Sequence, residues 1–291
     1  MTERKLEGQV AVVAGATRGL GRAIAVTLGA AGATVYCTGR SVKGSLSDIG
    51  RRETVDETAA MASEAGGRGI AVRVDHTEEP QVRALFERIA DEQDGRLDIA
   101  VNDIWGGESL TQWGVPFWEH DLDKGLAMQK RAVWSHLITA RYAAPLLAAR
   151  KSGLLAEITD GWDYRYRGSL YYSLAKISAI HVAQGMAADL KPHGVTAVAV
   201  SPGFLRSEEM LDHFGVTEAN WRDAAAKDPH FLQSETPYYA ARGIAALAAD
   251  PNLHAKTGGV YTSWGLSDEY GIDDLDGRRP HWGRYAAEQG F

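Results

Sequence analysis

Residues 10–25 read VAVVAGATRGLGRAIA. The apolar start predicts a buried strand over Val10–Ala14, the amphipathic end predicts a helix, and a glycine turn lies between them. Glycines 15, 19 and 21 would allow a sharp exit from the strand, close approach of a pyrophosphate, and tight packing of helix on strand. The helix N-terminus would offer N–H groups and a positive dipole end to phosphates. We therefore expect a dinucleotide cofactor at this turn rather than a plain strand–turn–helix unit.

Composition limits the class of protein. The chain has 291 residues, a net charge of −7 and no basic stripe, so we expect no nucleic-acid partner. Its single cysteine, Cys37, excludes a disulfide within the chain and suits a reducing compartment. No apolar run reaches the roughly 18 residues of a membrane span, and the polar start lacks a signal segment. We expect a cytoplasmic protein without a membrane partner.

Short apolar runs alternate with helical patterns along the chain, which predicts parallel strands joined by helices. The expected strands are 10–14, 34–38, 70–74, 97–102, 154–159, 195–200 and 259–263. One long helix is expected over 122–149 and another over 171–190. We predict an α/β fold: a doubly wound, seven-stranded parallel sheet with helices on both faces. It would form one domain over 1–263, including a substrate cover at about 204–236. The extension 264–291 shows little periodicity and would pack on the body or on a partner subunit.

The residues after the second strand bear on the choice of cofactor. An acidic residue there would bind the ribose 2′-hydroxyl and select NAD, but Gly39 takes that position and Arg40 follows. Arg18, in the glycine turn, points to the same region. Two guanidiniums can clamp a 2′-phosphate, so we predict NADP(H) over NAD(H), the alternative being two solvated arginines beside a loop.

Two further segments keep two or more interpretations. Asp75, at the end of the third strand, could accept from the adenine amino group or could cap its own loop. Residues 108–120 carry Trp113, Phe117 and Trp118, and could line a pocket, act as a lid or make an oligomer contact.

Tyr172 and Lys176 lie four residues apart on a predicted helix and therefore share one face. A free phenol ionises near pH ~10, so it is a poor acid or base at neutrality. A neighbouring ammonium and a positively charged nicotinamide would lower the phenol's pKa; a shift of about 3 units needs about 4 kcal/mol. Tyr172 could then protonate a carbonyl oxygen, or deprotonate an alcohol in the reverse direction.

Six motifs together resemble the short-chain dehydrogenase/reductase family over roughly residues 7–263: AGATRGLG, TGR, VDH, VNDIWG, YSLAK and SPGFLRS. The resemblance implies a Rossmann-type fold, an NAD(P)(H) cofactor and interconversion of carbonyls and alcohols. It also implies a homodimer or homotetramer packed through long helices. The cofactor contacts that we assign are Gly15, Thr17, Arg18, Gly19, Leu20, Gly21, Arg40, Ser41, Asp75, His76, Asn102, Tyr172, Lys176, Pro202, Gly203, Leu205 and Ser207. No metal ligands are assigned.

The chain departs from the family pattern at three places. Residues 102–105, Asn-Asp-Ile-Trp, replace the NNAG motif and bring Trp105 to the nicotinamide side. The family's catalytic serine corresponds to Thr159 or Asp160; Asp160 would need a raised pKa to donate, and could instead cap its loop. Arg131 and Ala132 stand where the family's relay asparagine is expected, so the proton relay must differ or be absent.

These features predict an NADP(H)-dependent reductase of a carbonyl compound, or the reverse alcohol dehydrogenase. Tyr172 would be the acid/base, Lys176 its electrostatic partner, and Asp160 or Thr159 would orient the substrate. Three aromatic side chains suggest a partly apolar or ring-bearing substrate: Trp105, Trp162 and Phe204. Two other functions stay open: an NADP(H)-binding sensor or scaffold with little turnover, and a reaction without net redox, such as an epimerisation.

Overall fold

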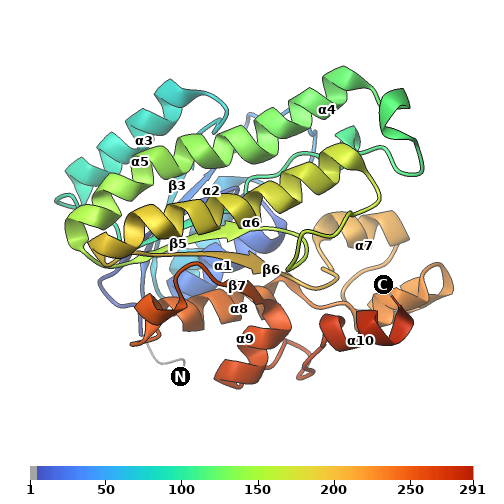
Figure 1. Ribbon diagram of the computed structural model, residues 1–291. Coiled ribbons are helices and arrows are strands. Elements are labelled where there is room, and N and C mark those ends of the chain that lie inside the picture. The colour runs from blue at the N-terminus through green and yellow to red at the C-terminus, as the bar shows by residue number, and fades with distance from the viewer. Residues whose placement is uncertain (1–4, 291) are drawn as a thin grey trace.

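The structure, a computed structural model, describes residues 5–290. Its centre is one parallel sheet with the strand order β3-β2-β1-β4-β5-β6-β7 (Figure 1). The strands are β1 Val10–Ala14, β2 Thr34–Gly39, β3 Arg68–Arg73, β4 Ile99–Asn102, β5 Leu154–Ile158, β6 Thr196–Ser201 and β7 Val260–Thr262. From β1 the chain adds β2 and β3 on one side of the sheet, and it then adds β4 to β7 on the other side, so the strand order reverses between β1 and β4. Ligands of such sheets bind at the carboxyl ends of the strands beside this reversal. The predicted seven-stranded, doubly wound α/β fold is confirmed.

Ten α-helices are described. They are α1 Gly19–Ala30, α2 Val55–Glu64, α3 Glu79–Glu92, α4 Leu122–Gln129, α5 Ser135–Arg150, α6 Leu170–Leu190, α7 Glu208–Phe214, α8 Pro237–Ala248, α9 Ser263–Tyr270 and α10 Trp282–Gln289. Among the described residues, no helix combines the length and the apolar character needed to cross a bilayer.

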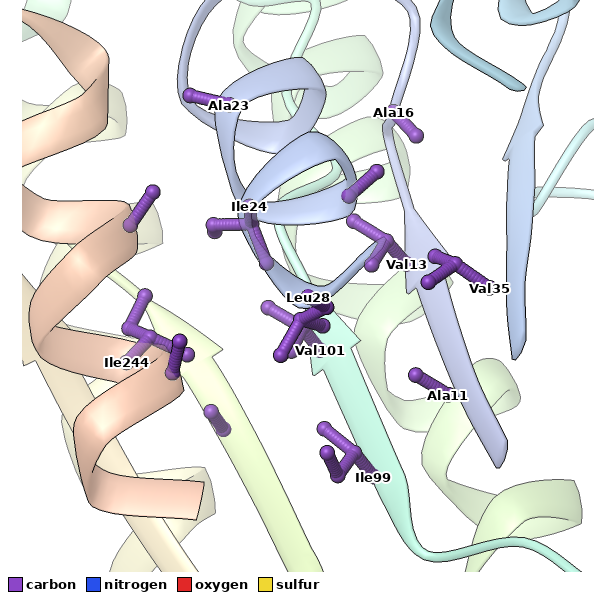
Figure 2. Close-up of a cluster of buried hydrophobic side chains, with 14 of the residues drawn as sticks. Ala11, Val13, Ala16, Ala23, Ile24, Leu28, Val35, Ile99, Val101 and Ile244 are labelled. Carbon is purple, nitrogen blue, oxygen red and sulfur yellow. The ribbon is translucent and has the colours of Figure 1, made fainter. Parts of the chain in front are cut away.

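Both faces of the sheet are covered by helices. On one face, Ile24 and Leu28 of α1 and Ile244 of α8 pack against Val13 and Val101 (Figure 2). On the other face, α3, α5 and α6 pack against the alternate side chains of the same strands (Figure 1). Every residue of β1 is buried, because successive side chains enter the two opposite cores.

Two elements differ from the sequence-based expectation. The single helix expected over 122–149 contains a π-helical segment, Lys130–Trp134, between α4 and α5. Such segments insert a residue into the helix and are frequent at functional sites. The little-structured extension contains α9 and α10, whose buried Trp264 and Ala286 pack these helices onto the body.

Candidate active site

A cleft of about 1250 Å³ opens at the carboxyl ends of the strands. Its walls come from the glycine turn after β1, the loops after β2 to β6, the start of α6, the segment around α7, and α10. Pockets for drug-sized ligands measure roughly 300–1,000 Å³, so this cleft has room for a dinucleotide together with a substrate.

The glycine turn is packed too closely for a side chain at position 15 or 21. Gly15 has φ +90°, and a Cβ there would overlap the carbonyl of Asp103. A Cβ on Gly21 would overlap the carbonyl of Gly15 and lie 2.9 Å from Asp103 Oδ2. The N–H of Gly19 already donates to the Glu208 carboxylate at 2.8 Å, so this helix end accommodates an anion. The turn therefore fits a pyrophosphate, and Thr17, Arg18 and Leu20 line the cleft beside it.

The end of β2 has no room for an acidic side chain. A Cβ on Gly39 would lie 2.5 Å from Thr17 Oγ1. Arg40 and Ser41 border the cleft, and Arg40 Nη1 pairs with Asp48 Oδ1 at 2.7 Å. Ser41 is buried, and its hydroxyl donates to the Ser47 hydroxyl at 3.1 Å. The position of an NAD-selecting carboxylate is therefore taken by Gly39, and the next residue, Arg40, brings a guanidinium to the border of the cleft.

Arg18 reaches the cleft from the glycine turn, but it too has an acidic neighbour. Its Nη2 lies 3.9 Å from Glu209 Oε2 on α7. Both predicted phosphate-binding arginines therefore face a carboxylate in this structure.

Asp75 and His76, which were predicted to lie beside the adenine, make their hydrogen bonds within the protein. Asp75 Oδ1 accepts from the N–H and the hydroxyl of Thr77, at 2.9 and 2.7 Å, which is the loop-capping alternative. Burial alone would raise the pKa of Asp75, but these bonds and Arg40 lower it. The His76 ring lies between the hydroxyls of Thr38 and Thr139, each at 2.8 Å. Burial lowers its pKa to about 3, so the ring is neutral. Both residues still border the cleft.

Asn102, predicted to contact the cofactor, is not among the residues that line this cleft. Its amide is buried and donates to Glu157 Oε1 at 2.7 Å and to the carbonyl of His136 at 3.3 Å. Its side chain therefore joins strand β4 to β5 and α5.

Tyr172, Asp160 and Lys176 meet in the cleft. The Tyr172 hydroxyl donates to Asp160 Oδ2 at 2.6 Å. The Lys176 Nζ lies 5.6 Å from the centre of the Tyr172 ring and 3.8 Å from the centre of the Trp105 ring. One face of α6 and the end of β5 therefore bring together a phenol, a carboxylate and an ammonium.

The pKa of Tyr172 moves in the direction opposite to the sequence-based expectation. Burial and the Asp160 carboxylate raise it well above its ordinary value of 10.0. Burial lowers the pKa of Lys176, although Asp160 works against that shift. The expectation left out the burial of Tyr172, which contributes most to the shift, and the Asp160 carboxylate 2.6 Å from the hydroxyl, whose negative charge also disfavours a phenolate.

The two residues proposed in place of a catalytic serine have different surroundings. The Thr159 hydroxyl donates to the main-chain carbonyl of Lys176 at 2.6 Å, which ties β5 to α6. Asp160 instead accepts directly from Tyr172.

Arg131, at the position expected for a relay asparagine, lies in the π-helical segment. Its guanidinium donates to the carbonyl of Gly106 at 3.1 Å and pairs with Asp48 at 2.7 Å. This position therefore clamps the loops that follow β2 and β4 to each other.

Comparison with known proteins identifies the family of this chain. The sequence model of the short chain dehydrogenase family matches residues 9–215. The chain belongs to the short-chain dehydrogenase family. It is 34% identical over 277 residues to "Dehydrogenase/reductase SDR family member 1" of Mus musculus, covering 94% of this chain and 85% of that protein.

Two other proteins, one compared by sequence and one by structure, are also similar to this chain. This short-chain dehydrogenase is 28% identical over 211 residues to the 7alpha-hydroxysteroid dehydrogenase of Escherichia coli, covering 71% and 74% of the two chains. A short chain dehydrogenase structure from Mycobacterium thermoresistibile superposes with a TM-score of 0.76 at 21% identity, covering 96% of this chain and 92% of that one. Membership makes the chain an oxidoreductase of a family that uses NAD(P).

Aromatic side chains form much of the remaining wall of the cleft. Trp105, Trp162 and Phe204 lie there, as predicted from the sequence. The structure adds Trp113, whose ring is 5.0 Å from that of Tyr172, and Trp282 of α10. Phe117 and Trp118 are mostly exposed and do not line the cleft. The nicotinamide-side residues also border it: Pro202, Gly203, Leu205 and Ser207.

A buried acidic network lies behind the cleft, and it was not predicted from the sequence. Glu157 Oε2 lies 2.5 Å from His136 Nδ1, and the other ring nitrogen lies 2.9 Å from the carbonyl of Ile104. Burial alone would lower the pKa of His136, but Glu157 raises it. Burial raises the pKa of Asp103 to about 7. The available signal was a glutamate inside the apolar strand β5.

The C-terminal extension borders one end of the cleft. Arg206, buried in the segment 204–236, pairs with Glu218 at 2.8 Å and with Asp276 of the extension at 3.3 Å. Its guanidinium also lies 4.1 Å from the centre of the Trp221 ring. Trp282 of α10 packs against Phe204 of this segment and lines the cleft.

Proposed function

We propose that this short-chain dehydrogenase interconverts a carbonyl and a secondary alcohol with NADP(H). The observation that carries the proposal is the hydrogen bond from Tyr172 to Asp160, in the cleft that also holds the glycine turn. A proton donor, an ammonium and a pyrophosphate cradle are the parts that hydride transfer to a carbonyl requires.

The residues present divide the work as follows. When bound, the reduced nicotinamide supplies a hydride to the carbonyl carbon. Tyr172 donates its proton to the carbonyl oxygen, and Lys176 stabilises the resulting phenolate. Asp160, at the solvent-accessible cleft, then passes a proton from water back to Tyr172. The carbonyl gains one hydride and one proton, and the cofactor is oxidised.

The raised pKa of Tyr172 favours the direction of reduction. At neutral pH the phenol keeps its proton, which is the protonation state that reduction requires, whereas alcohol oxidation needs the phenolate. Asp160 therefore lies beside the tyrosine, in the place of the family's serine. It also supplies the proton that an asparagine relay would otherwise carry.

The preference for NADP(H) rests on the end of β2. The crowded position of Gly39 keeps an acidic group away from the ribose, and Arg40 and Arg18 both border the cleft. A 2′-phosphate would replace Asp48 and Glu209 as the partner of these guanidiniums. Arg40→Ser should weaken NADPH binding by roughly tenfold and leave NADH binding within about twofold, as titrations of cofactor fluorescence would show.

The experiment that tests the reaction measures NADPH oxidation with a panel of aryl ketones. Tyr172→Phe should lower kcat/KM by roughly 10²–10⁴-fold, while the Kd for NADPH stays within about twofold. If no ketone oxidises NADPH in the wild-type protein, or if the variant is as fast, the proposal is wrong.

A sensor that binds NADP(H) with little turnover is the second candidate. Glu208 on the Gly19 N–H and Arg131 at the relay position favour it. The same panel separates the two functions, because a sensor would bind NADPH without consuming it in the presence of any ketone.

A further inference from the structure

Arg167 places a guanidinium in the cleft beside the reacting groups. It precedes α6 and lines the cleft with Asp160, Gly161 and Tyr172. Its guanidinium occupies the space where a side chain of residue 161 would lie, since a Cβ on Gly161 would overlap Nη2 and Cζ of Arg167. The glycine therefore makes room for the arginine, whose side chain is only 21% exposed.

This guanidinium has few acceptors of its own. Within residues 5–290, its buried Nε has no hydrogen-bond partner. Nη2 approaches Asp163 Oδ1 at 3.5 Å, but Arg165 already holds that carboxylate through its Nε at 2.6 Å and its N–H at 3.0 Å. Arginine has five N–H donors, and leaving buried ones unsatisfied is costly. The buried Nε–H is closed to a ligand, but Arg167 lines the cleft, and its Nη groups keep donors that a ligand there could satisfy.

Aromatic side chains form much of the cleft that Arg167 lines. Trp113, Trp162, Phe204 and Trp282 belong to it, and the rings of Phe204 and Trp282 meet edge to face with centres 5.7 Å apart. Asp160, an acidic group of the same cleft, already accepts from Tyr172. A ligand that fits must therefore combine an apolar body with an anionic group placed at the guanidinium.

We propose that the substrate is an oxo acid with an aromatic or apolar body, whose carboxylate is bound in a bidentate manner by Arg167. This rests on the proposed carbonyl reduction and names its substrate class. Planar guanidinium and carboxylate groups match through two parallel hydrogen bonds. The carboxylate takes no part in the reaction: the hydride still goes to the carbonyl carbon and the proton to its oxygen.

The test compares benzoylformate and benzoylpropionate with their methyl esters as substrates. The wild-type protein should have a kcat/KM at least roughly tenfold higher for one of the acids than for its ester, since a hydrogen-bonded charge is worth ten- to hundredfold. Arg167→Met should abolish that preference, and Arg167→Lys should restore part of it. The matched control is Arg83→Met on α3, an arginine away from the cleft whose side chain is 51% exposed.

A binding measurement keeps the proposal falsifiable without turnover. In the NADP⁺-loaded Tyr172→Phe protein, calorimetric titration should show the acid binding roughly tenfold more tightly than the ester, and adding Arg167→Met should remove the difference. Equal binding of acid and ester, or an equal loss for both in Arg167→Met with an unchanged Tm, would overturn the proposal. Reduction of the esters without any preference for the acids would reject the oxo-acid assignment and leave the reductase function standing. If no carbonyl is reduced, the function fails, and the titration alone decides whether Arg167 binds a carboxylate.

Discussion

At the scale of single residues, Gly21 shows how closely the cofactor turn is packed. A Cβ there would overlap the carbonyl of Gly15 and lie 2.9 Å from Asp103 Oδ2. Gly21→Ala should therefore lower the free energy of unfolding by about 1–3 kcal/mol, as urea titration would measure, because neither backbone can move away. Gly185→Ala on α6 is the control: nothing lies within 4 Å of its Cβ, and it should stabilise the protein by about 0.5–1 kcal/mol. Equal effects at the two sites would contradict this account of the turn.

Asp160 sets the pH range over which Tyr172 can donate a proton. In the wild-type protein the phenol's pKa lies well above 10.0, so the reduction rate should show no loss from phenol ionisation below that pH. Asp160→Asn removes a negative charge 2.6 Å away, which should lower the phenol's pKa by roughly 1–3 units. The alkaline limb of kcat/KM for reduction should then move to lower pH, since an acid is lost once it ionises. A pH–rate profile measures this, with Asp189→Asn, on the exposed far end of α6, as the control. An alkaline limb that does not move would show that Asp160 does not control the pKa of the Tyr172 phenol.

At the scale of elements, the strands that are buried on both faces could be predicted from the sequence. The arrangement of the candidate active site could be predicted only in part. The apolar run of β1 leaves no alternative to a central strand. Thr159 and Asp160 are consecutive, and only the packing of β5 against α6 shows that Thr159 bonds to the Lys176 carbonyl while Asp160 bonds to Tyr172. Helix α10 is short and polar, and it is held by distant contacts such as His230 with Tyr285, which no local pattern reveals.

Helix α7 bears on how the cofactor enters. Its Glu208 occupies the Gly19 N–H that a pyrophosphate would use, and its Asp212 pairs with Arg51 beyond β2 at 2.8 Å. Binding of the cofactor must displace Glu208, so Glu208→Gln should lower the Kd for NADP⁺ by roughly three- to tenfold. Calorimetric titration checks this against Glu87→Gln on α3, an exposed change on the opposite side of the sheet. Weaker or unchanged binding in Glu208→Gln would mean that the carboxylate does not compete with the phosphates.

At the scale of the whole molecule, α5 and α6 lie side by side over one face of the sheet (Figure 1). Trp134, Leu137 and Leu174 are 55%, 46% and 49% exposed. Monomers seldom leave large contiguous apolar patches in water, and a self-complementary surface favours a second copy of the same chain.

We propose on these grounds that the chain forms a homo-oligomer through α5 and α6. Light scattering after size exclusion should give a mass that is a multiple of 31.5 kDa. The double variant Leu137→Glu/Leu174→Glu should elute as a monomer, because two buried carboxylates per chain would have no partner. Leu275→Glu, in the C-terminal extension and 54% exposed, is the matched control and should keep the wild-type mass. The glycine turn, Tyr172 and Lys176 line the cleft of a single chain, so the monomeric variant should still bind NADP⁺. A wild-type mass of 31.5 kDa would reject the oligomer, whereas loss of NADP⁺ binding on dissociation would show that the partner copy completes the site.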